Sequence, residues 1–449
     1  MAKKVDGSFT AYRGVRIRML PINHPDRLSL QAEIHARPHA RIRLPALVTN
    51  VSVFSEGVSV EDELKVLRQL PGQQNLTTVD AVNNFLRLRI TDYKVKWERH
   101  GEFTRYSITQ TLPAEFGWGQ SDPDLSLILK LPVGWLASLP GKTISATQLA
   151  LIGIEPASDD EMLTKAKKWL GSDNIVAARI GAGYATAFTD FQLREDGFCR
   201  YLAVAESLSE TRAGRVSSRL LELEIYRTMA LLAFPVARSL GPLLKAAEIQ
   251  LADITSAMEH EQLTDSELLH QLIALAARVE GATAAHSFRF SATTAYQNLV
   301  RTRIEDLREK RLAGVQTFSE FLNRRFVPAM ATIEATHSRL TNLSERIERS
   351  SALIRTRADI VREEQNQKLL EKLTDGQRLQ LRMQQTVEGL SIAAISYYAL
   401  GLVMYGLKAA KASGLGINTD IATGIAIPVV IAAVAYLTSK IRLKFHQNL

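Results

Sequence analysis

Two uncharged runs near the C-terminus constrain this chain more than any other feature of its sequence. Leu390 begins an 18-residue run that ends at Leu407, and Ile421 begins a 17-residue run that ends at Leu437. A helix needs about 20 apolar residues to cross the hydrocarbon core of a bilayer. Pro428 in the second run is tolerated in membrane helices and awkward in soluble ones. The sequence therefore predicts a transmembrane hairpin, with a buried hairpin in a soluble core as the alternative.

Charged residues around the two runs predict how the hairpin is oriented. Positive charges outside the hairpin are Arg378, Arg382, Lys440, Arg442 and Lys444, and those between the runs are Lys408 and Lys411. The positive-inside rule places both outer ends in the cytoplasm. The basic N-terminal segment lacks an apolar core of about 7–15 residues, so we expect no signal peptide. The single cysteine, Cys199, cannot form an internal disulfide, which is typical of a reducing compartment.

Turn-forming residues are distributed unevenly along the rest of the chain. Residues 1–197 hold 14 Gly and 10 Pro, whereas residues 198–387 hold 5 Gly and 3 Pro. Because these residues end helices and form turns, the change marks a domain boundary. We expect an α+β cytoplasmic domain over 1–200, a long-helix (all-α) region over 201–386, and the transmembrane hairpin with a basic tail over 387–449.

Alternating and apolar stretches predict the strands of the first part. The expected strands cover residues 47–54, 86–110 (as a hairpin), 144–155 and 175–180. The hairpin within 86–110 turns at His100-Gly101. Asp196-Gly197 predicts a second hairpin, because glycine accepts the positive φ that such a turn requires. A short amphipathic helix is expected over 161–170, and the mixture of elements is that of an α+β domain.

Long helices are expected in the second part, over residues 215–234, 266–280, 291–326 and 328–375. In the last of these, Ile333, Leu340, Ile347, Ile354 and Val361 recur every seven residues. The intervening heptad positions are mostly polar, whereas a coiled coil needs both seams apolar. The pattern predicts one contact stripe, which packs within the chain or, alternatively, in an oligomer.

The first candidate site combines histidine, glutamate and arginine. Glu33, His35 and Arg37 lie in the segment HPDRLSLQAEIHARPHARIRLP, and His39 follows His35 by four residues. Histidines at this spacing on a helix can share a metal ion, but Pro38 disfavours a helix there. Because arginine matches carboxylate and phosphate oxygens, an anion or nucleotide site is the second interpretation. A loop held by ion pairs is the third.

The second candidate site lies in the segment KWERHGEFTRYS. If this strand alternates, Glu98, His100 and Glu102 point to one side. There they could coordinate a cation or transfer protons. A hydrogen-bonded turn is the structural alternative.

Other functional motifs are excluded at the level of sequence. The segment GAGYATAF begins G-x-G, but Thr186 occupies the third glycine position and the residues after it are typical of a strand. A dinucleotide site needs a helix N-terminus there. The sequence contains no P-loop, G-x-S-x-G or H-E-x-x-H motif, and one cysteine cannot form a metal cluster. The net charge of +8 is mild and no basic stretch carries aromatics, so we expect no nucleic-acid partner. We assign no catalytic residue, metal ligand or cofactor.

Several phrases resemble the bacterial domain-of-unknown-function family 3422. They include LSLQAEIHARPHARI, KWERHGEF, RLLELEIYRTMALLAFP and LQLRMQQTVEGLSIAAISYYALGL. The most specific are H-A-R-P at residues 35–38 and E-R-H-x-E-F at 98–103, where Gly101 replaces an expected threonine. The resemblance spans residues 16–444. It implies a bacterial membrane-anchored protein without an established activity.

The order of the parts is also similar to that of CorA-type magnesium channels. Those channels carry Tyr-Gly-Met-Asn at the end of the first span. Here Tyr405 and Gly406 match, but Leu407 and Lys408 replace the last two residues. The connection between the runs is net positive, which would repel magnesium.

Three functions are therefore carried forward. The first is a homo-oligomeric scaffold or envelope-associated partner in the bilayer of the bacterial inner membrane. In this hypothesis the chain crosses the membrane twice, with its N-terminal domain and C-terminal tail in the cytoplasm. The second is a divergent CorA-like channel or transporter, although neither run contains a carboxylate. The third is a membrane-tethered enzyme or nucleotide binder that takes an anionic small molecule at the two candidate sites.

Overall fold

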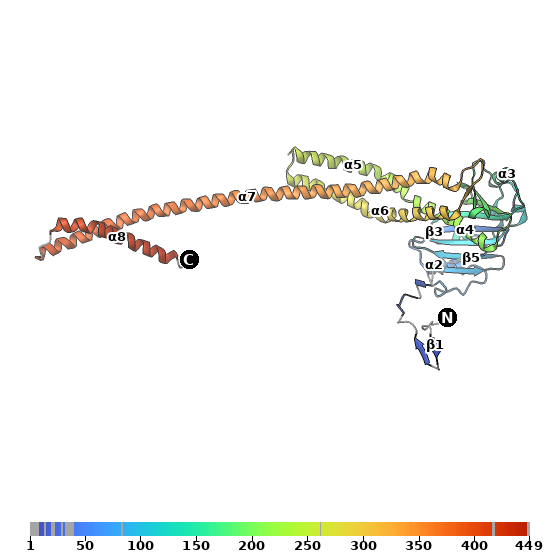
Figure 1. Ribbon diagram of the computed structural model, residues 1–449, viewed down its shortest axis with the longest axis horizontal. Coiled ribbons are helices and arrows are strands. Elements are labelled where there is room, and N and C mark those ends of the chain that lie inside the picture. The colour runs from blue at the N-terminus through green and yellow to red at the C-terminus, as the bar shows by residue number, and fades with distance from the viewer. Residues whose placement is uncertain are drawn as a thin grey trace. The chain divides into compact units, whose positions relative to one another are not determined.

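The chain folds into two compact units. A computed structural model describes residues 9–12, 15–18, 23–27, 30–31, 40–81, 84–260, 262–414 and 418–446. The first unit comprises Met1–Glu259 and His270–Glu348, and the second comprises His260–Leu269 and Arg349–Leu449. Figure 1 shows the sheet of the first unit and the helices of both.

A nine-stranded sheet forms the centre of the first unit. Its strands are β3 (Ala46–Phe54), β4 (Phe85–Arg89), β5 (Tyr93–Arg99), β6 (Phe103–Thr111), β7 (Thr143–Gly153), β8 (Val176–Ile180), β9 (Ala185–Leu193), β10 (Cys199–Ala205) and β11 (Lys310–Arg311). Their order across the sheet is β11-β8-β9-β10-β7-β3-β6-β5-β4. β10 and β7 pair in parallel, and the other neighbouring pairs described in this sheet are antiparallel. A separate hairpin joins β1 (Phe9–Tyr12) to β2 (Val15–Arg18). The expected α+β region is therefore confirmed.

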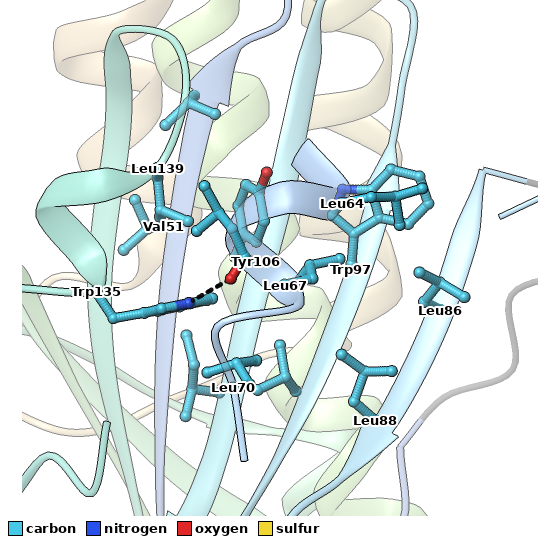
Figure 2. Close-up of a cluster of buried hydrophobic side chains, with 14 of the residues drawn as sticks. Val51, Leu64, Leu67, Leu70, Leu86, Leu88, Trp97, Tyr106, Trp135 and Leu139 are labelled. Carbon is cyan, nitrogen blue, oxygen red and sulfur yellow. Dashed lines mark hydrogen bonds between the residues drawn. The ribbon is translucent and has the colours of Figure 1, made fainter. Parts of the chain in front are cut away.

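Helix α2 (Val60–Leu67) covers one end of the sheet. It begins with a capping box, in which the Ser59 side chain accepts a hydrogen bond from the backbone N–H of Asp62. Its leucines pack on a buried cluster that includes Trp97 and Trp135 (Figure 2). The indole N–H of Trp135 donates to a backbone carbonyl of α2 over 2.9 Å. Apolar burial and satisfied polar groups therefore act together here.

Helix α3 (Asp159–Leu170) lies on the same face of the sheet as α2. Leu47 of β3 packs in the cluster of α3 and Val51 in that of α2, and strand residues an even number apart point the same way. Trp169 and Phe188 are fully buried in the cluster beneath it. The helix ends where Gly171 takes a left-handed conformation, with φ of 60°. The short helix expected over 161–170 is confirmed. Short 3-10 turns cover Ala114–Phe116, Leu125–Ile128, Leu136–Ser138 and Gly181–Gly183.

Helix α4 (Glu210–Leu231) crosses the opposite face of the sheet. The backbone N–H of Ile42 donates to the carbonyl of Glu210 over 3.1 Å, which ties the segment before β3 to the start of α4. An ideal Cβ at Gly214 would lie 1.7 Å from the carbonyl oxygen of Ala40. Only glycine permits this approach.

The remaining helices are α5 (Ala233–Glu259), α6 (Asp265–Leu307), α7 (Phe318–Ala412) and α8 (Thr419–His446). The prediction of separate helices over 266–280 and 291–326 was wrong, because α6 is continuous and ends at residue 307. The chain then turns, with a φ of 45° at Arg308 and of 81° at Gly314. Leu312 is fully buried in the cluster under α3, and β11 pairs with β8. Burial of this turn against the sheet outweighs its local helical pattern.

The contact stripe predicted in α7 is buried in its first half. Ile333, Leu340, Ile347 and Ile354 are each at most 3% exposed, whereas Val361 is 42% exposed. The buried half packs within the chain, as expected. Helix α7 also continues past residue 375, so the first uncharged run is its C-terminal end and not a separate helix.

Two apolar segments dominate the second unit. The most apolar 18-residue windows of α7 and α8 have mean hydropathies of 1.6 and 2.2, and only 6% and 0% of them are buried. Both segments are long enough to cross a membrane. The side chains of Ser396, Tyr397, Ile427 and Ile431 line a space between the two helices.

Candidate functional site

The structure describes the residues of only one of the two candidate sites predicted from the sequence. Glu33, His35 and Arg37 lie outside the described residues. Glu98 belongs to β5, whereas His100 and Glu102 lie in the turn before β6. The described residues include no group of three metal-ligating side chains.

Glu98 and Glu102 have different arginine partners. Glu98 is 2% exposed and accepts a hydrogen bond from Nε of Arg105 over 2.8 Å. Glu102 forms an ion pair with Arg289 of α6. The ring of His100 stacks on Phe103, with the centroids 4.5 Å apart. These contacts join the turn to its surroundings.

A basic pocket lies beside Glu98, on the face of the sheet that α4 crosses. We call it the basic pocket and define it by five cationic residues and two hydroxyl residues. These are Arg41, Arg87, Arg89, Lys94, Lys96, Ser107 and Thr109. Its volume is about 420 Å³, enough for a small molecule. None of the described residues that line it is acidic.

Strand register places the cations of the basic pocket directly opposite one another. Arg87 of β4 faces Lys96 of β5, and Arg89 faces Lys94. On β6, the partners of Lys96 and Lys94 are the hydroxyl residues of the pocket. Like charges directly opposite on neighbouring strands destabilise a sheet. Two such pairs lie side by side and concentrate positive charge at this surface.

Two of these cations have a lowered pKa. Burial, and then the positive charge of Arg105, lowers the pKa of Lys96 to about 8 despite the carboxylate of Glu98, 2.9 Å away. Burial also lowers the pKa of Arg87, and the neighbouring Arg89 adds to this. Burial lowers these pKa values because it disfavours the charged form of a cation, and the carboxylate of Glu98 opposes the effect at both residues.

A chain of buried and half-buried charges connects the basic pocket to α4 and α6. Burial would raise the pKa of Glu98, but Arg105 and Lys96 outweigh it and hold that pKa at about 2. Arg105 also approaches Glu222 of α4 at 3.8 Å, and Glu222 pairs with Nε of Arg303 at 2.6 Å. Acids and bases alternate along this chain, so it fixes the position of Lys96 at the pocket floor.

Sequence reasoning missed the basic pocket although its signal was present. The stretch LRLRITDYKVKWE places basic residues at every second position of two strands. From the sequence, this alternation predicts only a hairpin that turns at His100-Gly101. Only the register reveals that the two basic rows adjoin and face Ser107 and Thr109.

Of the two resemblances drawn from the sequence, comparison with known proteins supports only the one to the domain-of-unknown-function family. A family model described as "Protein of unknown function (DUF3422)" matches residues 22–445. No curated protein and no solved structure matches the chain, and the similarity to CorA-type channels is not confirmed. The match covers nearly the entire chain, including the basic pocket and both apolar segments. The chain belongs to the DUF3422 family.

Proposed function

We propose that this protein is a membrane-anchored binding protein for an anionic small molecule. The basic pocket binds the anion, and the apolar segments of α7 and α8 cross the bilayer. The anchor would lie in the bacterial inner membrane with both chain ends in the cytoplasm, as the flanking charges favour. The observation that carries the binding proposal is the pair of like-charged rungs, Arg87 with Lys96 and Arg89 with Lys94.

Calorimetric titration with sulfate tests the binding proposal, because sulfate keeps its two charges over a wide pH range. We expect the full-length chain in detergent to bind sulfate, and Arg87→Gln/Arg89→Gln to bind it at least about tenfold more weakly, since charged hydrogen bonds contribute about 1.5–3 kcal/mol each. Arg324→Gln/Arg325→Gln is the matched control, because these two arginines are exposed on α7. An equal loss of sulfate affinity in both double variants would mean that sulfate binding depends only on the net charge of the chain, which would contradict the proposal.

We further propose that the exposed part of α7 associates with a second copy. Residues 361–387 are exposed throughout the helix, with Leu369, Leu373 and Met383 more than half exposed. A stable helix normally buries such a face. Light scattering should give an oligomer for the unmodified chain in detergent and a smaller species for Leu369→Asp/Leu373→Asp. An unchanged mass for that variant would contradict the proposal.

A further inference from the structure

A second cationic pocket lies at the opposite end of the strand order from the basic pocket. We call it the arginine pocket and define it by Arg212, Arg215, Arg219, Arg308 and Tyr184, with Gly181 and Ala182 at its wall. Its volume is about 280 Å³. The wall follows β8 directly, and β8 is four strands from β3 in the sheet order, on the side away from β4.

Three of the four arginines share one face of α4. Arg212, Arg215 and Arg219 are spaced three and four residues apart, which brings their side chains to one side of a helix. Arg308 comes from a different segment, the turn after α6, where it adopts a positive φ of 45°. Like charges at this helical spacing repel one another. The cluster therefore costs stability as long as nothing neutralises it.

The arginine pocket has no internal counter-charge from the part of the chain that the structure describes. Among the described residues, no carboxylate forms an ion pair with any of these four arginines, whereas Arg99, Arg105 and Arg303 each pair with a glutamate. Arg212 also lies in the first turn of α4, where the helix dipole already disfavours a cation. Both facts make the pocket a region of strong positive potential.

One guanidinium group is held in a defined orientation. The Arg212 guanidinium carbon lies 3.9 Å from the centre of the Tyr184 ring. Stacking occupies the flat face of a guanidinium and leaves the N–H groups at its edge free to donate. Orientation before binding lowers the entropy cost of holding an anion.

From this geometry we propose that the arginine pocket binds a phosphate group of a phosphorylated ligand. A phosphate offers oxygens in several directions and can accept from three or four guanidinium groups, whereas a single carboxylate is filled by one or two. The pocket is too small and too polar for a large apolar ligand. The phosphate can belong to a soluble phosphorylated molecule or to a phospholipid headgroup. This proposal does not rest on the basic pocket or on its anion.

The test uses pyrophosphate as the probe and the full-length chain in detergent. Calorimetry is carried out in the Arg87→Gln/Arg89→Gln background, so that the basic pocket contributes little. We expect one binding event, weakened at least about tenfold by Arg215→Gln and again by Arg219→Gln, since each charged hydrogen bond removed costs about that factor or more. The control Arg324→Gln/Arg325→Gln should leave the affinity within about twofold.

Other outcomes would overturn the proposal. They are an absence of pyrophosphate binding in that background, or an equal loss in the control variant. Arg215 is exposed and Arg219 is half-buried, so unchanged tryptophan fluorescence is required to verify that their variants are folded. Nanodiscs of phosphatidylcholine with and without phosphatidic acid distinguish the two sources of phosphate. Competition by phosphatidic acid that Arg215→Gln/Arg219→Gln removes assigns a headgroup, and pyrophosphate binding unaffected by the lipid assigns a soluble ligand.

Discussion

Lys96 is a cation of the basic pocket whose pKa is strongly lowered. Its side chain is 14% exposed and is surrounded by Glu98, Arg105 and Glu222, which together with burial leave its pKa at about 8. Below that pH it is an ammonium group that can bind an anion, and above it the amine is neutral. Lys96 is therefore expected to make anion binding depend on pH as the pH passes through about 8.

We therefore expect sulfate affinity to fall as the pH rises through about 8. Lys96→Arg should bind sulfate equally below and above that pH, because an arginine stays charged. Calorimetry at three pH values measures this. Stability should change in the opposite sense. Between about pH 8 and the pKa of an unfolded lysine, about 10.4, the unfolded chain binds more protons, so the free energy of unfolding rises with pH. A sulfate affinity independent of pH in the unmodified chain would show that Lys96 does not contact the anion.

Helix α4 depends on one glycine for its position on the sheet. Replacing glycine by alanine inside a helix normally stabilises it by about 0.5–1 kcal/mol. At Gly214 the added Cβ would overlap the carbonyl oxygen of Ala40, so the backbone of one segment must move. We expect Gly214→Ala to lower the free energy of unfolding by about 1–3 kcal/mol.

Gly281 of α6 provides the matched control for this element. Nothing lies within 4 Å of a Cβ built at Gly281, so Gly281→Ala should be neutral or stabilising. Tryptophan fluorescence during urea unfolding measures both variants, because Trp97, Trp118, Trp135 and Trp169 all belong to the first unit. Equal stability of the two variants would mean that Ala40 moves aside without cost.

At the scale of the whole molecule, the uncovered apolar windows of α7 and α8 predict firm attachment to membranes. Leaving so much apolar surface in water costs about 25 cal/mol per Å². We expect the chain to remain in membranes through a carbonate wash, and deletion of residues 387–449 to release it. Ile425→Asp/Val429→Asp should weaken attachment, since a carboxylate at the centre of a span costs about 2.5–3.5 kcal/mol.

A matched substitution outside the apolar windows distinguishes attachment to the membrane from association with a second copy of the chain. Leu369→Asp/Leu373→Asp introduces the same charges into the exposed part of α7 and should leave attachment unchanged. An immunoblot of the pellet and the supernatant after the carbonate wash measures how much of each variant stays attached to the membrane. Full release of the unmodified chain by carbonate would contradict the proposal that the apolar segments anchor it in the membrane.

The sequence by itself determined the features that depend on contiguous residues. The hairpins at His100-Gly101 and Asp196-Gly197, the helix over 161–170 and the two apolar runs all follow from local conformation or from length. Gly197, for example, has the positive φ of 82° that its hairpin turn requires. Such features need no partner from elsewhere in the chain, which is why they could be predicted.

Only the tertiary structure decided what depends on residues far apart in the sequence. The order of the strands, the parallel pair β10 and β7, and the helix break that buries Leu312 follow from long-range packing. The two pockets have the same origin. Arg87 meets Lys96 through strand register, and Arg308 meets Arg212 because α4 and the turn after α6 adjoin the same loop. Which distant side chains come together depends on the packing of the whole core. A local sequence pattern does not contain that information.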